Sequence, residues 1–82
     1  MATSKEEIKE WVEEGKNNGS THVMIVCDTY DYDDYPVYVQ PEQDIREMLK
    51  AYSKDMQKVM EVYSMNLDID EQLSEHRSFN LD

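Results

Sequence analysis

The sequence predicts a small α+β fold with the element order helix, strand, strand, helix and short C-terminal helix. Two short runs rich in β-branched residues, at 23–27 and 37–39, flank a polar segment, which is typical of an antiparallel hairpin. Amphipathic segments precede and follow this hairpin. The chain has 82 residues and no internal repeat or linker, so we expect one domain over residues 1–82.

The first helix is expected to begin at a capping box, formed either by Thr3 and Glu6 or by Ser4 and Glu7. Its apolar residues share one helical face: Ile8, Trp11, Val12 and Gly15. The sequence Asn-Asn-Gly at 17–19 tolerates a left-handed backbone and should end the helix.

The two strands of the hairpin are expected at 22–28 and 36–40. Apolar residues occupy both alternating sets of the first strand, so both of its faces need cover. One helix can cover one face, and the other face needs a second helix or another subunit. Pro36 fits only a strand start or an edge strand, and Pro41 ends the second strand.

The segment 42–63 predicts one long amphipathic helix, about 33 Å long at about 1.5 Å per residue. Its apolar residues alternate spacings of four and three, which is a heptad pattern. The apolar face of such a helix is longer than a hairpin and one short helix can cover. We therefore expect a homo-oligomer, although packing within the monomer is an alternative. The expected interface residues are Leu49, Tyr52, Met56, Val59 and Tyr63. A last short helix should begin at Asp68, with Glu71 completing a capping box, and end near Arg77.

The net charge of −11 argues against direct binding to nucleic acid, because affinity for phosphates comes largely from lysine and arginine. An acidic surface suits a basic protein partner, or simply keeps a protein soluble. The sequence has no apolar run that could span a membrane. Its single cysteine, Cys27, excludes an internal disulfide and, in an apolar strand, is expected to be a small buried hydrophobe. These features favour a reducing cytoplasm.

No motif in the sequence indicates catalysis, and the two histidines lack a local partner pattern. The segment 31–34 lacks the glycine and the distal glutamate of a calcium-binding EF-hand loop. The segment 66–77 has Glu71 where that loop needs glycine and Arg77 where it needs glutamate. We therefore expect a protein that is not an enzyme and holds no metal or cofactor, with a divalent cation held loosely by a carboxylate pair of residues 31–34 as the alternative.

The acidic, tyrosine-rich loop between the strands is the candidate recognition site. Tyrosine rings can stack on a planar ligand or anchor a partner, and carboxylates accept hydrogen bonds. Phosphates of a ligand would need cations, for which Arg46 and Lys50 are the nearest candidates. The expected ligand-binding residues of the loop are Asp28, Tyr30, Asp31, Tyr32, Asp33, Asp34 and Tyr35. Of the tyrosines, Tyr35 adjoins the strand and has core packing as its main alternative.

About three-quarters of the chain resembles a group of small tailed-phage proteins. The resemblance is carried by THVMIVCDTYDYDDYPVYV (21–39), by the preceding WVEEGKNNGS (11–20) and by MQKVMEVYSMNLD (56–68). In that group a Gly-x-Thr-His turn is followed by a V-C-D-T-[FY]-D…D-Y-P-V-[YF]-V core. The resemblance implies a viral origin and a location in the host bacterial cytoplasm.

The sequence is consistent with three functions. The first is a phage accessory protein that counters host defence by sequestering a small nucleotide-derived immune signal. The second is an acidic inhibitor that binds a basic surface of a host defence protein, as a DNA mimic does. Its support is the charge concentrated at 6–14, 28–34 and 68–82. The third is a virion or assembly component. The tyrosines favour the first function slightly.

Overall fold

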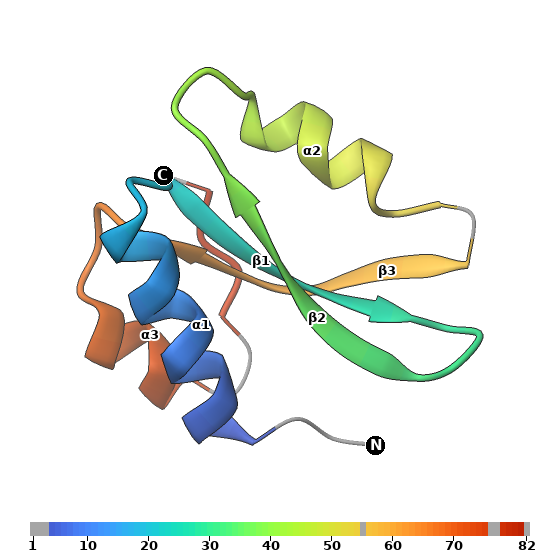
Figure 1. Cartoon of the computed structure of the whole chain (residues 1–82), viewed down its shortest axis with the longest axis horizontal. Helices are drawn as coiled ribbons and strands as arrows, with labels where there is room; N and C mark the ends of the chain where they lie inside the picture. The colour runs from blue at the N-terminus through green and yellow to red at the C-terminus, as the bar shows by residue number, and fades with distance from the viewer. Residues whose placement is uncertain (1–3, 55, 76–77, 82) are drawn as a thin grey trace.

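The computed structural model describes residues 4–54, 56–75 and 78–81, and within them the chain forms three helices and three strands. Their order is α1 (Lys5–Asn17), β1 (His22–Asp28), β2 (Asp33–Val39), α2 (Ile45–Ala51), β3 (Gln57–Ser64) and α3 (Ile69–Ser74). The strands form one antiparallel sheet with β1 in the centre, in the order β2-β1-β3 (Figure 1). Both outer strands run antiparallel to β1, and α2 connects them.

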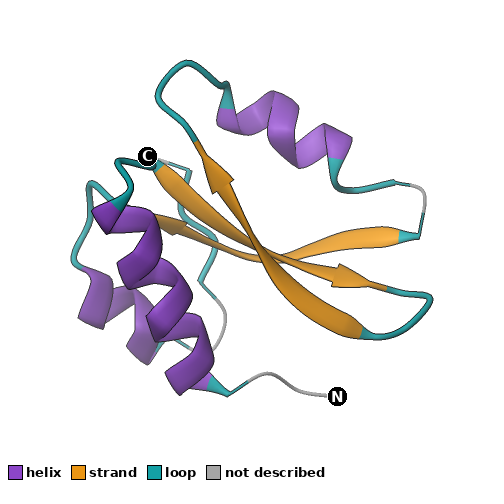
Figure 2. Cartoon of the chain, in the orientation of Figure 1, coloured by secondary structure: helices purple, strands orange, loops and turns teal. Residues whose placement is uncertain are grey.

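Helices of the same chain cover both faces of the sheet (Figure 2). On one face, α1 and α3 lie side by side over Val23 and Ile25 of β1. On the other face, α2 lies over Met24 and Val26. Alternate apolar residues of β1 therefore belong to two different hydrophobic clusters. The helix expected to cover the second face comes from the same chain, as α2.

The predicted start signals of α1 and α3 are confirmed. The Ser4 side chain caps α1 by accepting a hydrogen bond from the Glu7 amide at 3.2 Å, and Asp68 caps α3 through the Glu71 amide at 3.1 Å. The alternative cap at Thr3 lies outside the described residues, as does the expected end of the last helix at Arg77. Strand β1 has the predicted bounds.

The prediction of one long helix over 42–63 is wrong. Helix α2 begins after its cap Asp44 and ends at Ala51, and β3 follows from Gln57. The residues of the apparent heptad pattern lie in or next to two different elements, α2 and β3. A register shift lets Glu61 pair with Ile25 and Val59 with Val26, so that Met60 is the extra residue of a bulge. Residues 59 and 62 then share a face three positions apart, a spacing that imitates a helix.

The predicted sheet of two strands is also wrong, because β3 adds a third. Strand β2 begins at Asp33 rather than near Pro36, since pairing with β1 continues to Asp28 opposite Asp33. Tertiary pairing here overrides the weak strand preference of aspartate. Pro36 lies in mid-strand, and this is compatible with the edge position of β2.

The residues predicted to form an oligomer interface do not form one helical seam. Leu49 of α2, Tyr52 at the C-cap of that helix and Val59 of β3 pack on the same intramolecular cluster, and Tyr63 is fully buried on the opposite face. Met56 alone of this group is exposed. The homo-oligomer stays a prediction, without the helix on which it was based.

Candidate functional site

The predicted recognition loop is a tight turn of residues 29–32 between β1 and β2. Asp28 shapes it in two ways. Its carboxylate accepts a hydrogen bond from the Tyr30 amide at 2.8 Å, and its carbonyl accepts one from the Tyr32 amide at 2.6 Å. Asp28 therefore has a structural role in the turn, since side-chain bonding two residues onward is a common turn device.

A second turn, before β3, is attached to this loop. The backbone amide and the hydroxyl of Thr29 both donate to the Met56 carbonyl, each at 2.8 Å. Asp28 also pairs with Gln57, the first residue of β3. Two segments far apart in the sequence thus meet at one end of the sheet.

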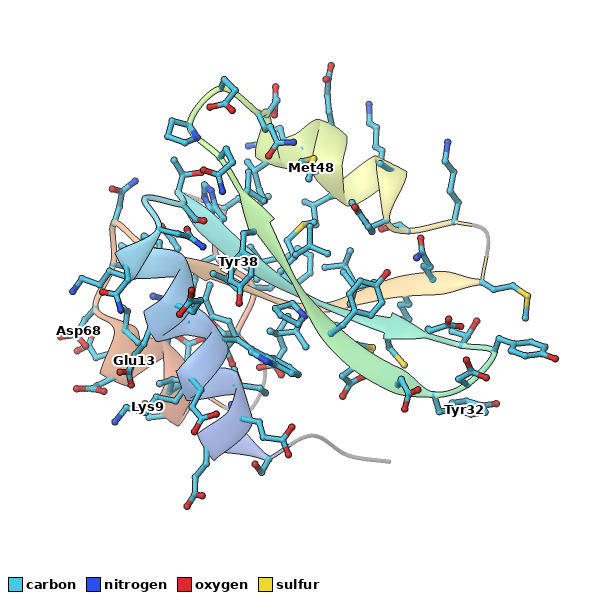
Figure 3. The ribbon with its side chains drawn as sticks, in the orientation of Figure 1. Lys9, Glu13, Tyr32, Tyr38, Met48 and Asp68 are labelled. Atoms are coloured by element: carbon cyan, nitrogen blue, oxygen red, sulfur yellow. The ribbon has the colours of Figure 1, made fainter. Side chains whose placement is uncertain are left out.

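Three large side chains are exposed at this end. Tyr30 is 74% exposed, Tyr32 65% and Met56 58%. Asp31 and Asp33 lie beside the two tyrosines in the sequence and are also exposed. We call these residues the tip surface: Tyr30, Asp31, Tyr32, Asp33 and Met56. Figure 3 shows Tyr32 at the far end of the hairpin, away from Lys9 and Glu13 of α1.

Two further residues predicted for the site belong to the sheet. Tyr35 is half-buried against the α2 side of the core, and its hydroxyl accepts a hydrogen bond from the Gln57 amide side chain at 2.6 Å. Burial, together with the nearby Tyr52 and Asp28, raises the pKa of Tyr35. Asp34 lies in β2 opposite Cys27. Burial, followed by the hydrogen bond and charge of Asp34, raises the pKa of the Cys27 thiol, which disfavours the reactive thiolate.

The two predicted phosphate-binding cations lie on α2, outside the tip surface. Strand β2 runs away from the tip, and Arg46 is in the first turn of the helix that follows it (Figure 1). Lys50 is in the last turn, and both side chains are exposed. The structure therefore does not gather Arg46 with Tyr30 and Tyr32.

A groove that the sequence reasoning missed lies between α1 and α3. It has a volume of about 410 Å³ and carries both signs of charge. Its lining residues are Lys9, Glu13, Lys16, Asn17, Ile69 and Asp70. The spacing of Lys9, Glu13 and Lys16 along one face of α1 was the available signal, but the partner helix could not be inferred from it.

Other polar groups of the core are engaged within the fold. His22 is buried, with Nδ1 3.0 Å from the Thr21 hydroxyl and Nε2 3.0 Å from the Leu81 carbonyl. The Tyr63 hydroxyl donates to Glu61 at 2.6 Å, and Lys5 lies 3.6 Å from the same carboxylate. Burial first, and then the bond to Glu61 and its charge, raises the pKa of Tyr63.

Within the described part of the chain, no group of three or more histidine, cysteine, aspartate or glutamate side chains could hold a metal ion. No helix among those residues is long and apolar enough to cross a membrane. Comparisons with protein-family models, curated proteins and solved structures found no match to this chain.

Proposed function

We propose that this protein is a non-catalytic binding protein that uses the tip surface to bind a basic surface of another protein. The observation that carries the proposal is the pair of exposed rings, Tyr30 and Tyr32, on a hydrogen-bonded turn between carboxylates. Tyrosine offers a large contact area with few rotatable bonds, and it is enriched among residues that anchor interfaces. The flanking Asp31 and Asp33 complement lysine and arginine.

The geometry favours a protein partner over a small nucleotide-derived ligand. Ligand pockets enclose most of the ligand surface, whereas Tyr30 and Tyr32 project into solvent. Of the two cations expected for ligand phosphates, Arg46 lies in the first turn of α2, toward the other end of the sheet, and Lys50 lies in the last turn of α2, outside the tip surface. Sequestration of a nucleotide signal is the second candidate, favoured by two exposed rings on which a base could stack.

The resemblance to small tailed-phage proteins supports a partner among the proteins of an infected bacterium. We infer that the protein acts in the host cytoplasm, where binding to a basic surface of a defence protein would inhibit that protein. The excess of 19 acidic over 8 basic residues would speed association with such a surface and make it sensitive to salt.

The proposal can be tested by affinity capture from bacterial cells with matched variants. Asp31→Asn/Asp33→Asn removes two charges from the tip, and Glu10→Gln/Glu42→Gln removes two exposed charges elsewhere. Tyr30→Ala/Tyr32→Ala removes the rings. We expect a basic protein to be captured by the wild type and by the Glu10/Glu42 control. Loss of both rings should weaken binding by about a hundredfold or more, since truncation of an interface anchor costs about 2 kcal/mol or more.

Capture of that protein should also weaken as salt is added. Equal capture by all four proteins would contradict the tip assignment. A small molecule retained in the native mass spectrum, and lost with the two rings, would instead support ligand sequestration. If neither a protein nor a small molecule depends on the tip, a role in virion assembly becomes the better hypothesis.

A further inference from the structure

Two residues of the described chain other than glycine adopt positive φ angles. They are Tyr32, at 59°, and Met56, at 66°. This left-handed region brings Cβ close to the backbone, so that glycine, asparagine or aspartate is the usual occupant. A turn that served only to reverse the chain would therefore be more stable with one of those residues.

Both left-handed residues are also large, exposed and located at the same end of the sheet. The bonds from Thr29 to the Met56 carbonyl tie one turn to the other. The two residues together expose a ring and a thioether, which the hydrophobic effect disfavours in the isolated protein. Neither backbone geometry nor burial within the monomer explains their size. Backbone strain of this kind is typical of positions that serve a function.

We propose that Met56 is the apolar anchor of the tip surface beside the rings of Tyr30 and Tyr32, and that it enters an apolar socket on a basic protein partner. This inference rests on the function proposed above and extends it to the turn before β3. Methionine is flexible and polarisable, and it adapts well to a pocket on another protein. Asp31 and Asp33 would face lysine or arginine side chains around that socket. Thr29 is a positioning residue, because it fixes the Met56 turn against the tyrosine loop.

The first test measures thermal stability, which requires no partner. Met56→Asn relieves the left-handed strain and removes an exposed apolar side chain, so its melting temperature should equal or exceed that of the wild type. Met48→Asn is the matched control, because Met48 packs against the core under α2 and its loss should lower the melting temperature. A clear fall for Met56→Asn would show that Met56 serves the fold and would overturn the inference.

The second test measures binding by calorimetry to a synthetic peptide with arginines on both sides of a leucine cluster. The comparison peptide has glutamate in place of each arginine. The wild type should bind the arginine peptide, and Met56→Asn should weaken this binding about tenfold, as expected for losing the burial of one apolar side chain. The glutamate peptide should not bind.

The outcomes separate this inference from the proposed function. If Tyr30→Ala/Tyr32→Ala weakens binding of the arginine peptide and Met56→Asn does not, the role of Met56 is wrong and the tyrosine site stands. If neither variant weakens binding, both assignments fail. Absence of binding by the wild type, or equal binding of the two peptides, overturns the assigned partner chemistry.

Discussion

Gly15 sets the distance between α1 and the sheet. A Cβ atom at this position would overlap Cγ2 of Val23 and would lie 3.3 Å from Cδ1 of Tyr38. The lack of a side chain therefore has a packing reason here. The position falls on the apolar face of α1 with Ile8 and Val12, and all three residues are buried.

We predict that Gly15→Ala destabilises the protein although alanine is the better helix former. The gain in helix propensity is about 1 kcal/mol, whereas overpacking of a close contact costs about 1–3 kcal/mol. Because Val23 belongs to the central strand, its room to move is small. Urea unfolding should show a lower free energy of unfolding for this variant.

Glu10→Ala provides the control for that measurement, since Glu10 is exposed on the same helix. Its effect on the free energy of unfolding should be small. A Gly15→Ala protein more stable than the wild type would mean that α1 can move away from β1 at little cost.

At the scale of elements, one buried side chain joins the last segments of the chain. Gln72 of α3 is 2% exposed. Its side-chain oxygen accepts from the Ser64 amide at 2.7 Å and from Asn80 at 3.1 Å, and its side-chain nitrogen donates to the Ser64 carbonyl at 2.8 Å. Gln72 thus links β3, α3 and residues 78–81, where Phe79 forms a parallel bridge with Val62.

Gln72→Leu is expected to destabilise the protein by about 1–3 kcal/mol, the usual cost of one buried polar group that loses its partner. The affected group is the amide of Ser64, a residue with no exposed surface, whereas the Ser64 carbonyl keeps a hydrogen bond from the Leu67 amide at 3.4 Å. Gln72→Glu keeps the acceptor but loses the donor and buries a carboxylate, so it should be destabilised more than Gln72→Leu. Urea unfolding of both variants checks this order, and a stable Gln72→Leu would show that water replaces the lost partner.

The elements with strong local signals could be predicted from the sequence, and those defined by long-range pairing could not. The helix caps at Ser4 and Asp68 and the apolar alternation in β1 depend only on neighbouring residues. The elements that they define could therefore be predicted from the sequence. Strand β3 was hidden because its bulge at Met60 imitates helical spacing. One clue was available, since a proline in β2 marks an edge and an apolar β1 then needs a neighbour on its other side.

The candidate site was predicted in part for the same reason. The loop with Tyr30 and Tyr32 is exposed as its composition suggests, but Tyr35 belongs to the core and Arg46 lies elsewhere. Met56 joins the tip through a bond from Thr29, and no local pattern reveals a contact between two turns so far apart.

For the whole molecule, the tyrosines predict how stability depends on pH. Burial and Glu61 raise the pKa of Tyr63 above its ordinary value of 10.0, and burial raises those of Tyr35 and Tyr38. The folded state thus retains protons that the unfolded state releases. Because the unfolded state then binds fewer protons, the free energy of unfolding falls as pH rises.

We predict that this contribution is fully present below about pH 10 and is lost progressively above it. Urea unfolding between about pH 8 and about pH 11 should show the decline. In Tyr63→Phe, which lacks the ionisable hydroxyl, the alkaline decline should be shallower. An equal decline in both proteins would place the alkaline sensitivity at other groups.

The central position of β1 also bears on how the chain folds during synthesis. Strand β1 is made first and can pair with β2 as soon as residues 29–39 follow, because the connecting turn is short. Its other edge must wait for β3, which arrives after α2. Until then the most apolar strand of the molecule presents an open edge, and open apolar edges promote aggregation. A nascent chain whose synthesis pauses before Gln57 exposes this edge. We therefore expect it to be the species that depends most on a chaperone.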